Sequence, residues 1–203
     1  MDPAEVLSRV VSTLGLPRLT RATIGRRRAA ILLYHDPSPE VVDAHLTHLR
    51  RRHALVSLDE LVEHLRAGTF DRLPERAVAI TIDDGHRGNR DLLPMCDSDE
   101  AEAEIAGCRS EIEGWLDRPC LHFAYPNGDH SPREVDMVRR AGYRSGRTTA
   151  IGWVGPRSDP YRLPILGVPD DASVTRLEAD LTGVTSWLAH HWGGGLPRPW
   201  RRG

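Results

Sequence analysis

Short apolar runs alternate along the chain with longer segments in which apolar residues recur every three or four positions. The short runs are rich in β-branched and aromatic residues, so they predict buried strands. A weaker strand is expected at 143–148. Because strands alternate with helices, the fold class predicted is α/β with a largely parallel sheet. The runs interpreted as strands or extended segments are 29–34, 77–82, 120–125 and 161–168.

Helix-capping patterns mark where several of the longer segments begin. Ser57 and Glu60 have the spacing of a capping box, and Ser131 and Glu134 repeat it with a proline at the first helical position. Gly68 is expected to end the first of these helices, as glycine does after many helices. The other helices predicted lie at 1–16, 39–52, 98–116 and 174–188.

The segment Ala77–Gly85 ends a buried strand on two adjacent carboxylates. Successive side chains of an extended backbone point to opposite sides, so Asp83 and Asp84 could divide two tasks. One could hold a cation while the other reaches a substrate or water. Acidic residues at the carboxyl end of a buried strand are a common site of catalysis in α/β proteins. The alternative is a strand followed by an Asp-rich turn.

Histidines near strand ends are further candidates for chemistry. His35 follows the strand 29–34, as Asp83 follows its own strand, so the two could share one edge of the sheet. The alternative is a histidine in a polar loop. His45 and His48 could chelate a metal from one helix, but no third ligand is evident, which favours a solvated helix face.

Composition and charge narrow the function classes. Hydrophobic residues make up 39% of the 203 residues, charged residues make up 28%, and the formal net charge is -2. This balance does not favour nucleic-acid binding. All basic residues are arginine, and the triplet Arg26–Arg28 is interpreted as a solvated flank. The three cysteines lack zinc-like spacing and favour a reducing compartment.

No apolar run reaches the roughly 18 residues that a membrane span needs. Residues 1–16 begin with acidic residues and predict an amphipathic helix, not a secretory signal. A cytoplasmic location is therefore expected. The domain division predicted is an N-terminal helix with an Arg-rich lead-in (1–28), one domain (29–189) and a disordered tail (190–203).

Four landmarks occur in one order along the chain: Leu32–His35, Thr81–Gly85, Phe123–Gly128 and Arg162–Gly167. Together they resemble the polysaccharide deacetylases of carbohydrate esterase family 4, over about residues 30–188. The resemblance implies a distorted (β/α) barrel that hydrolyses acetyl groups from N- or O-acetylated carbohydrates. Such an enzyme is a hydrolase of carbon–nitrogen bonds other than peptide bonds, and its partner is an acetylated oligo- or polysaccharide.

The resemblance also implies roles for residues of this chain. Asp83 would be the general base on a metal-bound water, and Asp84 would be a ligand of a divalent metal, usually zinc. A cation lowers the pKa of its water and polarises the acyl oxygen, while a carboxylate takes the proton. The residues implied for the substrate groove are Tyr125, Pro126, Asn127 and Gly128.

The chain departs from the family pattern at the metal site. The family's two metal-binding histidines lie between the aspartates and the Phe-Ala-Tyr-Pro strand, and this chain has no histidine from Arg87 to Leu121. Two βα units need roughly 40 to 50 residues, more than this segment offers. We therefore expect an incomplete barrel that is truncated between about residues 94 and 100.

Catalytic zinc usually has three protein ligands, and the resemblance supplies only Asp84. Additional candidates are His35, His86 and His122; the alternatives are ordinary turn and strand residues. Three functional hypotheses follow: an active metal-dependent deacetylase, a degenerate barrel that binds a glycan or a partner, and a truncated product that folds poorly. The family assignment requires Asp83 and Tyr125 to lie at the same end of the sheet.

Overall fold

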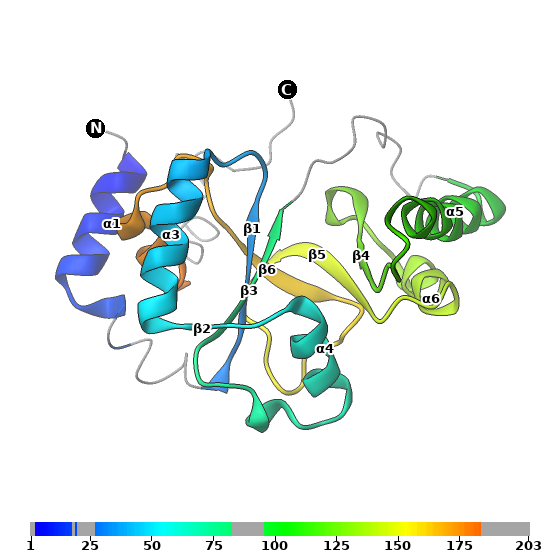
Figure 1. Cartoon of the computed structure of the whole chain (residues 1–203), viewed down its shortest axis with the longest axis horizontal. Helices are drawn as coiled ribbons and strands as arrows, with labels where there is room; N and C mark the ends of the chain where they lie inside the picture. Colours follow the sequence, from blue (N-terminus) through cyan, green and yellow to red (C-terminus); the bar gives the residue numbers. More distant parts are fainter. Residues whose placement is uncertain (1–2, 18, 20–26, 83–95, 184–203) are drawn as a thin grey trace.

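Six parallel strands form one curled sheet in the computed structural model, which describes residues 3–17, 19, 27–82 and 96–183 (Figure 1). The strand order is β2-β3-β1-β6-β5-β4. The predicted fold class, an incomplete α/β barrel, is confirmed. The strands are β1 (Ala30–Tyr34), β2 (Ala54–Leu55), β3 (Ala77–Ile82), β4 (His122–Ala124), β5 (Ser145–Ile151) and β6 (Leu163–Gly167).

Helices cover the sheet from several sides. In Figure 1, α1 and α3 lie at one side of the sheet, and α5 and α6 lie at the other. The helices are α1 (Pro3–Thr13), α3 (Pro39–Arg52), α4 (Leu58–Arg66), α5 (Ser98–Leu116), α6 (Pro132–Arg140) and α7 (Val174–Asp180). Short 3-10 turns occur at η2 (Phe70–Arg72) and η4 (Pro126–Gly128).

Both predicted capping serines begin their helices. The Ser57 side chain accepts a hydrogen bond from the backbone N–H of Glu60 at 3.0 Å. Ser131 and Glu134 form a complete capping box, in which each side chain accepts from the backbone near the other residue. These contacts satisfy backbone donors that have no partner inside the helix.

Strand β1 lies inside the sheet, between β3 and β6, and all five of its residues are buried. On one face, Ile31 and Leu33 pack in a cluster that includes Leu61 of α4. On the other face, Leu32 packs in a cluster that includes Leu49 of α3. A parallel strand with both faces covered has the near-continuous apolar run that the sequence shows.

The part of the sheet formed by β4 and β5 packs on α5 and α6 through a third cluster, which includes Ile105, Tyr125 and Val138. Strand β5 extends further than the weak strand expected at 143–148. Gly146 of β5 is required here, because a Cβ at this position would lie 2.7 Å from the Tyr125 hydroxyl oxygen.

The expectation that His45 lies on a solvated helix face is wrong. His45 is only 2% exposed, and its Nε2 lies 2.7 Å from the Ala172 carbonyl oxygen. His48 contacts the Glu178 carboxylate of α7 at 2.9 Å. The buried face of α3 therefore runs through His45 and Leu49, because α3 packs against both β1 and α7.

The N-terminal helix α1 packs against α7. This contact joins the start of the described chain to α7, the last helix among the described residues. Within the described ranges, no helix has the length and apolar character needed to cross a membrane. The predicted tail, 190–203, lies outside the described residues.

Candidate functional site

The carboxyl ends of all six strands lie at one edge of the sheet because the strands are parallel. Ile82, the last residue of β3, is in register with Tyr34, the last residue of β1. Tyr125 follows β4 at the same edge. The described ends of β3 and β4 therefore lie at the same edge of the sheet. Two of the predicted site residues, Asp83 and Asp84, follow Ile82 directly in the chain.

Three predicted site residues, Asp83, Asp84 and His86, lie outside the described part of the chain. Ile82 itself is 63% exposed although it ends a buried strand. Because Asp83 and Asp84 are not described, the structure shows the strand that leads to them but does not test the roles given to their side chains.

The loops after β1 and β6 meet at this edge. The backbone N–H of His35 donates a hydrogen bond to Oδ1 of Asp170 at 3.0 Å, and the N–H of Val168 donates to the Leu33 carbonyl at 2.9 Å. His35 is half-buried. Asp170 was not singled out from the sequence, although Asp170 and Asp171 follow an extended segment just as Asp83 and Asp84 follow theirs.

The predicted turn after β4 is built on residues with positive φ. Asn127 has a φ of 54° and Gly128 a φ of 77°. The Thr149 hydroxyl of β5 donates a hydrogen bond to the Asn127 carbonyl at 3.1 Å. A Cβ at Gly128 would lie 2.6 Å from the Thr149 backbone nitrogen, so only glycine fits. This turn holds the exposed Asn127 at the carboxyl edge.

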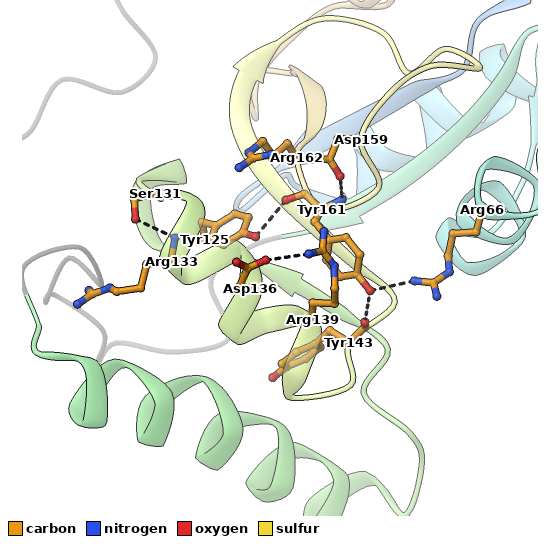
Figure 2. Close-up of polar contacts among 10 residues, drawn as sticks. All are labelled: Arg66, Tyr125, Ser131, Arg133, Asp136, Arg139, Tyr143, Asp159, Tyr161 and Arg162. Carbon is orange, nitrogen blue, oxygen red and sulfur yellow. Dashed lines mark hydrogen bonds and ion pairs between the residues drawn. The ribbon is translucent and has the colours of Figure 1, made fainter.

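Tyr125 supports the turn from inside the protein. Its side chain is 3% exposed, and its hydroxyl donates a hydrogen bond to the Tyr161 carbonyl at 3.0 Å (Figure 2). Its ring stacks on His130 with centroids 4.7 Å apart. Burial raises the pKa of the Tyr125 phenol, so the group remains neutral. The hydroxyl is therefore engaged within the protein.

A polar network links Tyr161 to Tyr143 and Arg66 (Figure 2). The Tyr161 hydroxyl donates to the Tyr143 carbonyl and accepts from Nη1 of Arg66, both at 3.0 Å. The Arg139 guanidinium lies over the Tyr161 ring at 4.7 Å from its centroid. The network connects α4, α6 and the loop before β6, and so fixes the residues against which Tyr125 packs.

His122 lies at the first residue of β4, and His35 follows the last residue of β1. Because the strands are parallel, the two histidines are at opposite edges of the sheet and the structure does not bring them together. His122 Nδ1 lies 2.9 Å from the Ser145 hydroxyl, and its Nε2 lies 3.9 Å from Asp59. Burial lowers the pKa of His122, while the nearby Asp59 carboxylate acts in the opposite direction.

A zinc site needs a convergent set of ligands, usually three from the protein at a catalytic site. Among the described residues, no group of three His, Cys, Asp or Glu side chains could hold a metal ion. The hydrogen bond between His35 and Asp170 uses the His35 backbone N–H and not its imidazole, so it does not join two metal-binding side chains. The described residues therefore do not fit a complete zinc site.

No protein-family model matches the sequence, and no curated protein matches it either. Solved structures do match. The Streptococcus pyogenes deacetylase PplD, in complex with acetate, has a TM-score of 0.62 and 17% sequence identity, and the match covers 74% of this chain and 96% of that one. A polysaccharide deacetylase from Bacillus cereus has a TM-score of 0.58 and 15% identity, with 76% and 69% covered. A de-N-acetylase from Aggregatibacter actinomycetemcomitans has a TM-score of 0.56 and 10% identity, with 75% and 99% covered.

These similarities concern the fold. The chain has the fold of the polysaccharide deacetylases, as the ordered sequence landmarks led us to expect.

Proposed function

We propose that the chain is a polysaccharide deacetylase-like protein whose site for an acetylated carbohydrate lies at the carboxyl edge of the sheet. The main support is the alignment of strand ends: Tyr34 is in register with Ile82, and the Tyr125–Gly128 turn follows a parallel strand at the same edge. The fold shared with three deacetylases supports the same assignment.

In the hydrolytic version of this proposal, Asp83 is the general base. It takes a proton from a water molecule as the water oxygen adds to the acetyl carbon. The bond from that carbon to the sugar nitrogen or oxygen then breaks, the proton passes to the leaving sugar atom, and acetate is released. Asp84 is the proposed ligand of a divalent metal, with His35 and His86 as further candidates.

The second candidate function is binding without hydrolysis. It is favoured by a specific observation: the sequence has no histidine from Arg87 to Leu121, where the family's two metal-binding histidines lie. A protein of this kind would hold an acetylated glycan at the same edge, through Asn127 and neighbouring exposed groups, and release no acetate.

Acetate release from an N-acetylglucosamine oligomer separates the two functions. A hydrolase releases acetate, and Asp83→Asn abolishes the release, whereas Asp71→Asn, at an exposed residue of η2, leaves it unchanged. A binding protein gives a calorimetric signal with the oligomer but no acetate. Absence of both release and binding would overturn the assignment to this substrate class.

A parallel zinc titration tests the metal. The proposal predicts stoichiometric binding that Asp84→Asn abolishes. Zinc binding that is indifferent to Asp84→Asn would reject Asp84 as a ligand, even if the oligomer still binds.

A further inference from the structure

Exposed apolar side chains gather at the N-terminal end of the described chain. Of the nine large hydrophobic side chains that are exposed among the described residues, four lie between residues 6 and 19. Val6 is 43% exposed, Val10 is 48% exposed and Leu14 is 70% exposed. The fourth is Leu19. No other segment of similar length in the described ranges exposes as many.

Val6, Val10 and Leu14 are spaced four residues apart, so they follow one side of the helix; we call these three residues the N-terminal stripe. The helical backbone continues to Leu14, whose N–H donates to the Val10 carbonyl at 3.0 Å. Ser8 and Val11, on a different face, are buried, and α1 packs against α7. The stripe is therefore presented outward by a helix that is already held by the rest of the fold.

The charge of this segment is opposite to that of the rest of the chain. Residues 1–28 contain six arginines and two acidic residues, whereas residues 29–203 contain 21 arginines and 27 acidic residues. Arg9, Arg27 and Arg28 are exposed. Arg9 is one residue before Val10 and lies beside the stripe. Residues 1–28 therefore carry a formal charge of +4 (6 minus 2), and residues 29–203 carry a formal charge of -6 (21 minus 27).

We propose that the N-terminal stripe, with Arg9, Arg27 and Arg28, binds the surface of an anionic lipid bilayer. An amphipathic helix with an apolar face and flanking arginines lies in the membrane interface, with apolar side chains among the acyl chains and guanidinium groups at the headgroups. The negative remainder of the chain is repelled by the same surface, which directs the N-terminal end toward it.

Two other occupants of the stripe are less consistent with these charges. A second copy of the chain would bring one arginine-rich segment against another. A free nucleic acid would match the arginines but leave the apolar side chains exposed to water. An anionic bilayer satisfies the apolar and the basic groups together.

The test is co-sedimentation of the full chain with vesicles of phosphatidylcholine alone or mixed with phosphatidylglycerol. We expect binding to the mixed vesicles, weakened by high salt, and little binding to phosphatidylcholine alone. The triple variant Val6→Ser, Val10→Ser, Leu14→Ser should lower the partition constant by roughly 100-fold. The triple variant Arg9→Gln, Arg27→Gln, Arg28→Gln should lower it about fivefold per arginine.

The control variants remove exposed apolar side chains or exposed arginines that lie outside the N-terminal segment. Leu116→Ser with Ile151→Ser removes exposed apolar side chains outside the segment, and Arg72→Gln with Arg118→Gln and Arg157→Gln removes exposed arginines. These variants should bind mixed vesicles nearly as wild type does. All substitutions are at exposed positions, and circular dichroism checks that each variant is folded.

Three results would overturn the proposal. The first is vesicle binding that the stripe variant leaves unchanged. The second is equal binding to both kinds of vesicle with no effect of the arginine variant. The third is a dimer in sedimentation velocity that the stripe variant dissociates, together with no vesicle binding, because the stripe would then be an interface between copies of the chain. None of these measurements depends on acetate release or oligomer binding.

Discussion

The Tyr34 hydroxyl lies 3.0 Å from Nδ1 of His45, on one side of a buried ring. On the other side of the ring, Nε2 lies 2.7 Å from the Ala172 carbonyl oxygen, which can only accept. Nε2 therefore carries the proton, and Nδ1 accepts from Tyr34. Burial lowers the pKa of His45, and the nearby His48 acts in the same direction. The neutral ring joins β1, α3 and the loop before α7.

The first prediction concerns the pH dependence of stability. In the unfolded chain His45 binds a proton near its ordinary pKa of about 6.5, whereas in the folded chain its pKa is lower. Below about pH 6.5 the unfolded state therefore binds more protons, and the free energy of unfolding falls as pH falls. This one group contributes up to about 1.4 kcal/mol per pH unit. Urea unfolding between pH 8 and 5 measures the slope.

The variant His45→Gln tests this assignment. Glutamine can still donate to the Ala172 carbonyl but does not titrate, so the slope below about pH 6.5 should be smaller than in wild type. Above that pH the two slopes should agree. An unchanged slope in the acidic range would show that His45 is not held neutral.

The second prediction concerns the turn after β4. Gly128→Ala forces a side chain into a positive-φ position and brings its Cβ to 2.6 Å from the Thr149 nitrogen. We expect a loss of about 2–4 kcal/mol in the free energy of unfolding. The control is Gly107→Ala, in the interior of α5 with no atom within 4 Å, which should raise stability by about 0.5–1 kcal/mol. Denaturant melts of both variants measure the difference, and equal effects would contradict this account.

Elements with strong local signals were predicted closely from the sequence. The helix at 39–52 and the helix at 98–116 have the bounds of α3 and α5. Their apolar spacing acts within one or two helical turns, so it can be recognised in a single sequence. The buried strands β1 and β3 were recognised for a similar reason, since both faces of each are covered and their residues are almost all apolar.

Features that depend on distant partners were not predicted. A weak strand was expected at 143–148, whereas β5 runs from Ser145 to Ile151 because it pairs with β4 on one side and β6 on the other. His45 was expected on a solvated face, and it is buried because Tyr34 and Ala172 offer it partners. The meeting of His35 with Asp170 likewise depends on residues far apart in the chain.

The third prediction asks whether the Tyr125 hydroxyl stabilises the fold or contacts the substrate. Tyr125→Phe removes the donor to the buried Tyr161 carbonyl, which should cost about 1–2 kcal/mol of stability. Because the hydroxyl is engaged inside the protein, binding of an N-acetylglucosamine oligomer should not change. Denaturant unfolding and calorimetry measure the two effects on the same samples.

A matched control is Tyr143→Phe, whose hydroxyl donates to the Ile105 carbonyl at 3.1 Å in the same apolar cluster. Its loss of stability should be similar, again without an effect on oligomer binding. If only Tyr125→Phe weakened binding, the Tyr125 hydroxyl would have to contact the glycan, and the supporting role assigned to it would be wrong.

The fourth prediction concerns the link between the loops after β1 and β6. Asp170→Ala removes the carboxylate that accepts from the His35 N–H, while Asp170→Asn keeps an oxygen in the same place. Alanine should lower the free energy of unfolding by about 1 kcal/mol, and asparagine should lower it by less. If the carboxyl edge is the glycan site, alanine should also weaken oligomer binding in calorimetry, because His35 then loses the contact that positions its backbone. If the two variants were equally stable and both bound the oligomer as wild type does, the hydrogen bond would not organise this edge. If both lost binding to the same extent, the Asp170 charge itself would be the group that matters.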